Sequence, residues 1–456
     1  MKDYPKPVYP QLPPGSISSE TLAERLQFIC RAQPVKYTSR LEDHVPGYDI
    51  KEGQHVLLVL DDGYEPSVVN ALQLAITRSG AHVDTVVVSG FERGQFGPAG
   101  LDGSAEARRF DLGHPLASTH WWKTIPDQAK YDLILQGEGG PIMKRKDVEQ
   151  QHVKWKTAEQ VLGEETTYPR ELQLLIDKKV FDHIQSFERV RITDPEGTDI
   201  TFTNYKDGLR WNHPMHHWGK PLWTDPDQED LSGVIAGTSN HVGFYPHVKV
   251  FLKGSIVVKV EGGGKFGTEF NRLLKKYEDI SLPKYKDRFG NERNPPPSYF
   301  YYWEQAIGTS PKIFRPIHGI GTRQGLLYER ERSGYIHHGF GPSSDLVMSG
   351  QLQKAGLPTG HLHVHTLFST YTGETKSGEK VNLIEKGHLT VLDDPDVRKM
   401  ASKFGDPDKL LKEAWFPAIP GINCPGNYES DYAKDPAKWA MQEQYERFFG
   451  SSEDRS

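Results

Sequence analysis

Residues 54–63 read QHVLLVLDDG, a short apolar run that ends in two aspartates and a glycine. This pattern predicts a buried parallel strand, because strands that are covered on both faces are almost continuously hydrophobic. An amphipathic segment covers residues 66–79, and a second apolar run covers residues 81–88. A strand, a helix and a strand in this order form a βαβ unit. With a third strand expected at residues 131–137, the first part of the chain is predicted to be an α/β layer structure.

The loop after the first strand argues against a nucleotide site. Residues 61–65 are rich in acidic side chains and lack a G-x-G-x-x-G pattern. We therefore expect residues 18–185 to form an N-terminal Rossmann-like α/β domain that binds no dinucleotide. After a helix at 170–185, strand and turn patterns dominate, so residues 186–456 are predicted to be a C-terminal β-rich α+β domain that binds a metal. Its proline-rich last segment should wrap around it as a tail.

Composition narrows the class of protein. The chain has 456 residues and a formal net charge of −6, so it lacks the basic surface that nucleic-acid binding requires. No apolar run is long enough for a membrane span, and the N-terminus does not resemble a signal peptide. Two cysteines, Cys30 and Cys424, exclude a disulfide framework and favour a reducing, cytoplasmic location. We expect no nucleic-acid or membrane partner, and the sequence leaves a homo-oligomer open.

Residues 360–368, GHLHVHTLF, place histidine at every second position: His361, His363 and His365. Alternate side chains of a strand share a face, so the three imidazoles are expected to point one way and the apolar residues between them the other way. Imidazole is a ligand of Zn, Cu, Fe and Ni. The pattern therefore predicts a metal site, against the alternative of a polar face that holds no ligand.

Four further histidine groups lie in the second half of the chain, each beside glycine or aromatic residues. Such neighbours suit a pocket wall, where backbone and ligand approach closely. Any single histidine is better explained as an ordinary core or surface residue, but the set clusters in one predicted domain. The groups contain Trp211 and His213, then His241, Phe244 and Tyr245, then His318, and finally His337 and His338.

A family resemblance becomes visible at the start of the predicted second domain. Residues 187–202, with RIT at 191–193 and GTDIT at 197–201, resemble the corresponding opening in peptidase family M29, the thermophilic aminopeptidases. The resemblance also covers the βαβ start and residues 231–365. The same scaffold is used by 2,5-dihydroxypyridine 5,6-dioxygenase. The resemblance implies a metalloenzyme whose ligands come from the second domain.

In the aminopeptidases, two glutamates, a histidine, a tyrosine and a final His-x-Asp hold two metal ions. The matched positions in this sequence hold His241, His318, His337 or His338, Ser344, and His363-Val364-His365. Histidine thus replaces both glutamates and the final aspartate. Bridging carboxylates hold two dications close together by neutralising their charge, so this replacement favours one metal over two.

The resemblance to the dioxygenase implies one Fe(II), bound here by His318, His363 and His365, with Zn as the alternative metal. His241 and His337 are expected to be catalytic, His241 by accepting a substrate proton. The residues expected to bind the substrate are Trp211, His213, Phe244, Tyr245 and His338. The expected partners are a small-molecule substrate and O2.

Three functions follow as alternatives. The leading one is a mononuclear non-haem Fe(II) dioxygenase that cleaves a hydroxylated aromatic or N-heteroaromatic ring. The second is a metal-dependent aminopeptidase or amidohydrolase of the M29 type, for which Glu329 or Glu331 could supply the missing general base. The third is a non-catalytic metal- or ligand-binding protein. A cupin-type oxygenase is disfavoured, because Ser369 and Thr370 stand where a cupin has a glutamate.

Overall fold

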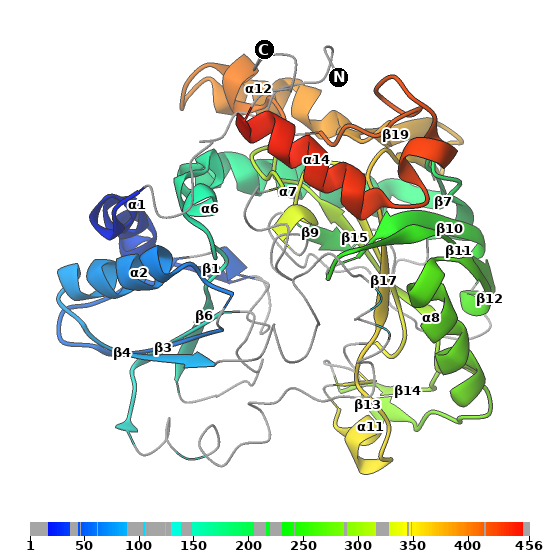
Figure 1. Ribbon diagram of the computed structural model, residues 1–456, viewed down its shortest axis with the longest axis horizontal. Coiled ribbons are helices and arrows are strands. Elements are labelled where there is room, and N and C mark those ends of the chain that lie inside the picture. Colours follow the sequence, from blue (N-terminus) through cyan, green and yellow to red (C-terminus); the bar gives the residue numbers. More distant parts are fainter. Residues whose placement is uncertain are drawn as a thin grey trace.

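The computed structural model describes most of the chain between residues 17 and 449. The described residues are 17–36, 44–45, 47–61, 63–88, 104, 107, 124, 129–137, 148–204, 216–218, 230–240, 242–286, 290–315, 328–343, 346–347, 349–414 and 416–449. Within them the fold is mixed α/β with several sheets (Figure 1). The blue N-terminal sheet lies on one side of the molecule in Figure 1, and the green and yellow strands lie on the other.

A four-stranded parallel sheet forms the N-terminal part, in the order β4-β3-β5-β6. Its strands are β3 (His55–Asp61), β4 (His82–Val88), β5 (Leu133–Gln136) and β6 (Glu149–His152). Helices α1 (Ser19–Arg31) and α2 (Pro66–Arg78) pack against each other, and α2 also contacts β4. Leu58 and Leu60 face the core shared with these helices, while Leu57 and Val59 face a smaller cluster with Ile134. Burial on both faces explains the continuous apolar run of β3.

An eight-stranded antiparallel sheet forms the largest layer, in the order β12-β11-β10-β8-β7-β18-β19-β20. Its strands are β7 (Phe187–Thr193), β8 (Asp199–Thr203), β10 (Ser232–Ser239), β11 (Phe244–Lys253), β12 (Ile256–Gly262), β18 (Thr370–Thr375), β19 (Lys380–Glu385) and β20 (His388–Leu389). Strands β7 and β8 are the hairpin expected around the Asp194–Gly197 turn. They follow directly on helix α7 (Arg170–Ser186).

A separate four-stranded antiparallel sheet has the order β17-β16-β15-β9. Its strands are β9 (His216–Trp218), β15 (Tyr302–Gly308), β16 (Ile336–Phe340) and β17 (Leu362–Thr366). Strand β17 also contacts β10 of the larger sheet. A Cβ atom on Gly237 of β10 would lie 2.6 Å from the carbonyl oxygen of His365, so glycine lets the two strands come this close.

Short helices and strand pairs complete the described fold. They are β1 (Val35–Lys36) paired with β2 (His44–Val45), β13 (Tyr285–Lys286) paired with β14 (Glu292–Arg293), α6 (Ala158–Leu162), α8 (Gly264–Lys276), α11 (Gln351–Lys354), the 3-10 helices η3 (Glu164–Thr167) and η6 (Thr390–Asp393), α12 (Pro395–Ala401), α13 (Pro407–Leu410), the π-helix η7 (Tyr428–Tyr432) and α14 (Pro436–Phe449). The C-terminal segment packs onto the β-rich part, because α14 contacts β11 and Ile419 and Tyr432 share a core with Leu367.

The elements expected from the sequence appear with small changes at their ends. The strands predicted at 54–63, 81–88 and 131–137 are β3, β4 and β5, and the helix predicted at 170–185 is α7. The mixed α/β class is therefore confirmed. A distinct Rossmann-like domain and the boundaries 18–185 and 186–456 stay predictions.

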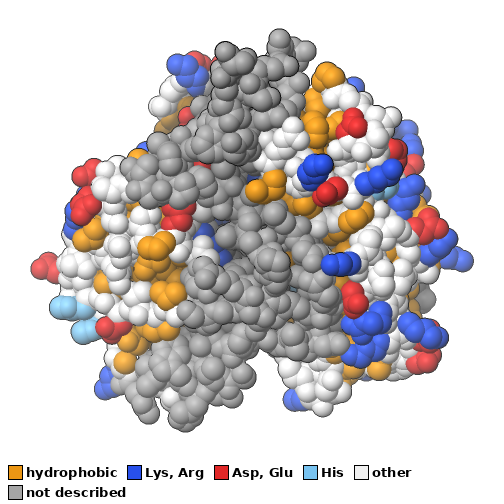
Figure 2. All heavy atoms as spheres, in the orientation of Figure 1, with side chains coloured by type: hydrophobic (Ala, Val, Ile, Leu, Met, Phe, Trp, Pro, Cys, Tyr) orange, Lys and Arg blue, Asp and Glu red, His pale blue; other side chains and the backbone are white. Residues whose placement is uncertain are grey.

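The described surface carries charges of both signs. Figure 2 shows basic and acidic side chains interspersed on the face drawn there. Around α8, for example, Arg272 pairs with Glu269 and Lys275 with Glu278. Among the described helices none is both long enough and apolar enough to cross a bilayer.

Candidate metal centre

Three neighbouring strands bring Glu304, His337 and His363 together. Glu304 lies on β15, His337 on β16 and His363 on β17. In the antiparallel register, Gly339 of β16 stands opposite Glu304 on one side and opposite His363 on the other. Directly opposed residues of adjacent strands project from the same face of a sheet. The two side chains therefore flank Gly339, and His337 joins them from two residues away on the same strand.

A β-bulge decides which face Glu304 occupies. Tyr302 pairs with Phe340, whereas Glu304 pairs with the preceding residue, Gly339, so Trp303 is an extra residue in β15. Without the bulge, Tyr302 and Glu304 would share a face, because side chains of a strand alternate with a period of two. A bulge of this kind redirects a side chain. Here it turns the Glu304 carboxylate toward the histidines and leaves Tyr302 on the other face.

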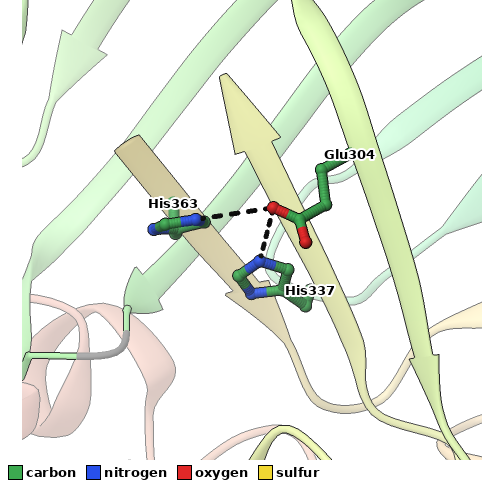
Figure 3. A group of neighbouring side chains, drawn as sticks. All are labelled: Glu304, His337 and His363. Atoms are coloured by element: carbon green, nitrogen blue, oxygen red, sulfur yellow. Dashed lines mark ion pairs between the residues drawn. The ribbon is translucent and has the colours of Figure 1, made fainter. Parts of the chain in front are cut away.

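The carboxylate oxygen Oε2 of Glu304 is the point on which the imidazoles converge (Figure 3). It lies 3.2 Å from Nε2 of His337 and 3.7 Å from Nε2 of His363. All three side chains are buried, and the site lies inside the fold. Nε2 of a fourth residue, His361, lies 3.4 Å from the same oxygen, and this side chain is 30% exposed. His361 therefore stands between the buried group and solvent.

The arrangement fits a single metal ion. The group offers one carboxylate oxygen and two imidazole nitrogens within 4.8 Å of one another. Bonds from zinc to nitrogen or oxygen are about 2.0–2.2 Å long, so two ligand atoms on one ion lie roughly 3–3.6 Å apart. The 3.2 Å distance from Glu304 to His337 is in this range and the 3.7 Å distance to His363 lies just above it, so small adjustments would open a space for the ion. A Glu, His and His set that could bind a metal is thus present, while the geometry leaves the identity of the metal open.

Gly339 provides the space for the Glu304 carboxylate. A Cβ atom at this position would lie 2.8 Å from both Cβ and Oε2 of Glu304. Contacts this short require the glutamate to move, so every other residue type would displace it. The glycine in the middle of β16 has no packing side chain of its own, and a strand glycine often marks such a close approach.

Burial and hydrogen bonding set the protonation of the group. Burial lowers the pKa of His337 to about 3, so the ring is neutral near pH 7. Burial alone would raise the pKa of Glu304, but His337, His361 and His363 outweigh it and hold this pKa well below its usual range. The group therefore contains an ionised carboxylate beside the neutral ring of His337, and Glu304 supplies a single negative charge to meet a cation.

His365 supports His337 instead of joining the group. Its Nε2 lies 3.0 Å from Nδ1 of His337, and its Nδ1 is hydrogen-bonded to the hydroxyl of Tyr335. Both partners are buried, and burial lowers the pKa of His365 well below its ordinary value. A hydrogen bond to the second ring nitrogen of a ligating histidine fixes its tautomer and orientation. His365 and Tyr335 thus form a chain that ends on His337.

The structure does not bring His338 to this group. Its ring lies on the opposite face of β16, where Nδ1 is 2.7 Å from the Tyr302 hydroxyl and Nε2 is 3.1 Å from Oγ1 of Thr366. It is fully buried, and burial lowers its pKa to about 3. Adjacent residues of a strand face opposite sides, so His337 and His338 cannot both reach the carboxylate.

Two of the three aromatic residues expected to bind substrate, Phe244 and Tyr245, are packed in the core. The Tyr245 ring stacks on Phe266 with 4.2 Å between centroids, and its hydroxyl lies 2.7 Å from the carbonyl oxygen of Ser239. Phe244 is also buried, and Cζ of Arg315 lies over its ring, 5.1 Å from the ring centroid. Trp211, His213, His241 and His318 lie outside the described residues.

Glu304 is the residue that the sequence interpretation missed. It lies in the run SYFYYWEQAIG at residues 298–308, in which a glutamate and a glutamine interrupt aromatic and aliphatic residues. A carboxylate in a strand that is otherwise buried needs a partner, because an unpaired buried charge is costly. The presence of a glutamate in this apolar run could be seen in the sequence. The face of the sheet on which Glu304 lies could not, since the bulge at Trp303 changes it.

Comparisons with known proteins found a distant likeness in structure. No protein-family model matches the chain, and no curated protein matches it. Among solved structures, 2,5-dihydroxypyridine dioxygenase from Pseudomonas putida KT2440 is similar with a TM-score of 0.44 and 14% identity, covering 82% of this chain and 98% of that one. Wild-type AmpT from Thermus thermophilus is similar with a TM-score of 0.42 and 14% identity, covering 81% and 98%. At this level of similarity, the chemistry has to be argued from the side chains of this chain.

Proposed function

We propose that this protein is a mononuclear metalloenzyme and that its metal is held by Glu304, His337 and His363, with His361 beside this group at the exposed side. The observation that carries the proposal is the convergence of imidazole nitrogens on one buried carboxylate oxygen, at 3.2 Å from His337 and 3.7 Å from His363. In this proposal His365, expected from the sequence to be a ligand, orients His337.

Two histidines and one carboxylate form the facial set of non-haem Fe(II) oxygenases, and a ferrous ion bound there would supply reactivity toward O2 beside a chelated substrate. One negative charge from Glu304 leaves a divalent ion with one positive charge. This residual charge favours an anionic substrate over a neutral peptide. We therefore propose a dioxygenase that cleaves a hydroxylated aromatic or N-heteroaromatic ring.

The residues around the group have separate tasks in this proposal. Ionised Glu304 supplies charge, and its carboxylate is held in place over Gly339. His337 must direct the lone pair of Nε2 to the ion, so its proton lies on Nδ1 and is donated to Nε2 of His365. His365 in turn places its own proton on Nδ1, where the Tyr335 oxygen accepts it. His361, at the exposed edge, is the imidazole that an incoming substrate would meet first.

A comparison of carboxylates favours the oxygenase over a hydrolase. A metal-dependent hydrolase uses a base to take the proton of the attacking water. Glu329 and Glu331 were the candidates for this role, but both are held in buried ion pairs. Glu329 binds the guanidinium of Arg315 through both oxygens, and Oε2 of Glu331 lies 2.7 Å from Nζ of Lys154. Among the described residues, Glu304 is the only carboxylate in the candidate metal group.

One observation keeps the hydrolase as a second candidate. Two histidines and one glutamate also form the zinc site of metalloproteases such as thermolysin, where the metal activates water. The donor set of Glu304, His337 and His363 is the same in kind. A metal-dependent aminopeptidase or amidohydrolase is therefore the alternative, and a non-catalytic metal-binding protein is the third.

The test compares oxygen uptake with amide hydrolysis. Iron-loaded protein is given catechol, gentisate and 2,5-dihydroxypyridine in an oxygen electrode, and zinc-loaded protein is given leucyl amide. The proposal predicts oxygen uptake with a hydroxylated ring compound, its loss in Glu304→Gln, and its retention in Glu269→Gln, which alters a partly exposed glutamate on α8. Rapid leucyl amide hydrolysis without oxygen uptake for any ring compound would favour the hydrolase instead.

A further inference from the structure

The segment from Tyr328 to Arg332 crosses the same face of the sheet as the candidate metal group. Gly308 lies on β15 four residues beyond Glu304, and a Cβ atom there would lie 2.6 Å from the carbonyl oxygen of Arg330. The segment is also hydrogen-bonded to the end of β15, because the amide of Ser310 donates to the carbonyl of Glu331 at 3.0 Å. The backbone of this segment is therefore fixed against the sheet at Gly308, two residues along β15 from Ala306, the residue that pairs with His337.

The charged side chains on either side of Arg330 have buried partners. Glu329 binds Arg315, and Glu331 binds Lys154. Nη2 of Arg332 donates to the carbonyl oxygen of Leu367 at 3.1 Å, and its guanidinium lies 4.7 Å from the centroid of the Phe416 ring. These contacts anchor the residues on both sides of Arg330.

Arg330 differs from Glu329 and Glu331, because within the part of the chain that the structure describes no carboxylate pairs with its guanidinium. Its Nε atom is buried without a hydrogen-bond partner, as are Nε and Nη1 of Arg332, although Arg332 is bonded to Leu367 through Nη2. Its positive charge lowers the pKa values of both His337 and His365, beyond the larger lowering that burial produces. A guanidinium group with a buried donor needs a partner, because an unsatisfied buried donor is costly. Arg330 thus offers an unused cation close to the metal group.

We propose that Arg330 is the anion-binding residue of this site, and that the substrate carries a carboxylate or similar anionic group in addition to the atoms that reach the metal. The proposal rests on the function proposed above and names its substrate class. Arginine suits the role because its planar donors match the two oxygens of a carboxylate. A divalent ion beside Glu304 keeps one positive charge, and Arg330 adds a second. The site therefore matches a dianion that has a chelating oxygen at one end and a carboxylate at the other.

The test uses a pair of probes that differ in charge. 3,4-Dihydroxybenzoate, whose two ring oxygens chelate a metal and leave the carboxylate free, and its neutral amide, 3,4-dihydroxybenzamide, are titrated into Co(II)-loaded protein, and binding is followed by visible absorption. We expect Arg330→Gln to weaken 3,4-dihydroxybenzoate binding by about 10- to 100-fold, the value of a charge-assisted hydrogen bond, and to change binding of the amide little. Arg330→Lys should keep part of the preference for the anion. Arg272→Gln, which alters an exposed arginine on α8, should keep all of it.

The outcomes separate this proposal from the metal site itself. Cobalt content is measured in every variant, so a loss of metal is seen directly. If Arg330→Gln keeps cobalt and weakens both probes equally, or neither, the proposal is overturned. If the wild-type protein holds no metal, the proposed function fails. The role of Arg330 is then decided by comparing the affinities of the metal-free protein for benzoate and for benzamide. Loss of a benzoate preference in Arg330→Gln would then support the anion site, and an unchanged preference would overturn it.

Discussion

Replacement of Gly339 by alanine tests how closely Glu304 is positioned. The added Cβ atom would lie 2.8 Å from Cβ and Oε2 of Glu304, so the glutamate must move by several tenths of an ångström. Positions of metal ligands and reacting groups tolerate only about 0.5 Å before function suffers. Loss of orientation at such a site costs about 10- to 100-fold in metal affinity, which corresponds to about 1.4–2.8 kcal/mol.

The same substitution has two opposing effects on stability. Alanine restricts the unfolded chain and would stabilise the protein by about 0.4–1 kcal/mol at an unstrained site. Overpacking against Glu304 costs about 1–3 kcal/mol, so the net result should be a loss of stability of at most about 2.6 kcal/mol. Gly405→Ala is the matched control, because its Cβ atom would meet only Cδ1 of Leu410, at 3.6 Å.

Two measurements check this prediction. Metal affinity is measured by competition with a chromophoric chelator, and stability by urea unfolding of the metal-free protein. Gly339→Ala should bind metal more weakly than both the wild type and Gly405→Ala. Equal metal affinity in all three proteins would show that the position of the Glu304 carboxylate does not matter for the metal.

Three further predictions concern other buried groups. Tyr335→Phe removes the hydroxyl partner of His365 and should weaken metal binding up to about 10-fold in the chelator assay; unchanged affinity would exclude a supporting chain. Burial, and to a smaller extent the nearby charge of Asp194, raise the pKa of Glu196 to about 8 in the folded protein. The stability that protonated Glu196 contributes is therefore lost as the pH rises through this value. Glu196→Gln should therefore gain on the order of 1–3 kcal/mol over the wild type above this pH in urea unfolding, and no gain would contradict the assignment. A hydrogen bond to Glu413 raises the pKa of His388 to about 9, and Asp393 contributes to the rise. The wild type should therefore be more stable than His388→Gln at low pH, by less than about 1 kcal/mol because the ring is partly exposed. This difference should disappear as the pH rises from about 6.5 to about 9. A constant difference across that range would contradict the pairing.

The sequence predicted those parts of the fold that depend on local periodicity. The apolar run of β3 and the amphipathic α2 appear where they were expected. A strand buried on both faces is hydrophobic throughout, whereas a helix buried on one side alternates between apolar and polar residues with its own period. The alternation in GHLHVHTLF also placed His363 and His365 on one face of β17. The alternating pattern alone did not predict which of these imidazoles lies next to a carboxylate.

The rest depends on pairing between strands that are far apart in sequence. Glu304 reaches the histidines only because of the bulge at Trp303 and because Gly339 stands between it and His363. For adjacent His337 and His338, the register with β17 decides which ring faces the group. Bulges and register are properties of the assembled sheet, and no short stretch of one strand specifies them.

Metal content of protein purified without oxygen shows whether Glu304 and its neighbouring histidines hold an ion. Mass spectrometry of the wild type, Glu304→Gln and the control Glu269→Gln gives the number and kind of ions per chain. We predict one metal ion per chain in the wild type and the control, and a large loss in Glu304→Gln, because the buried carboxylate is the only negative charge in the described group. Two ions per chain in the wild type, or full metal content in Glu304→Gln, would contradict this prediction.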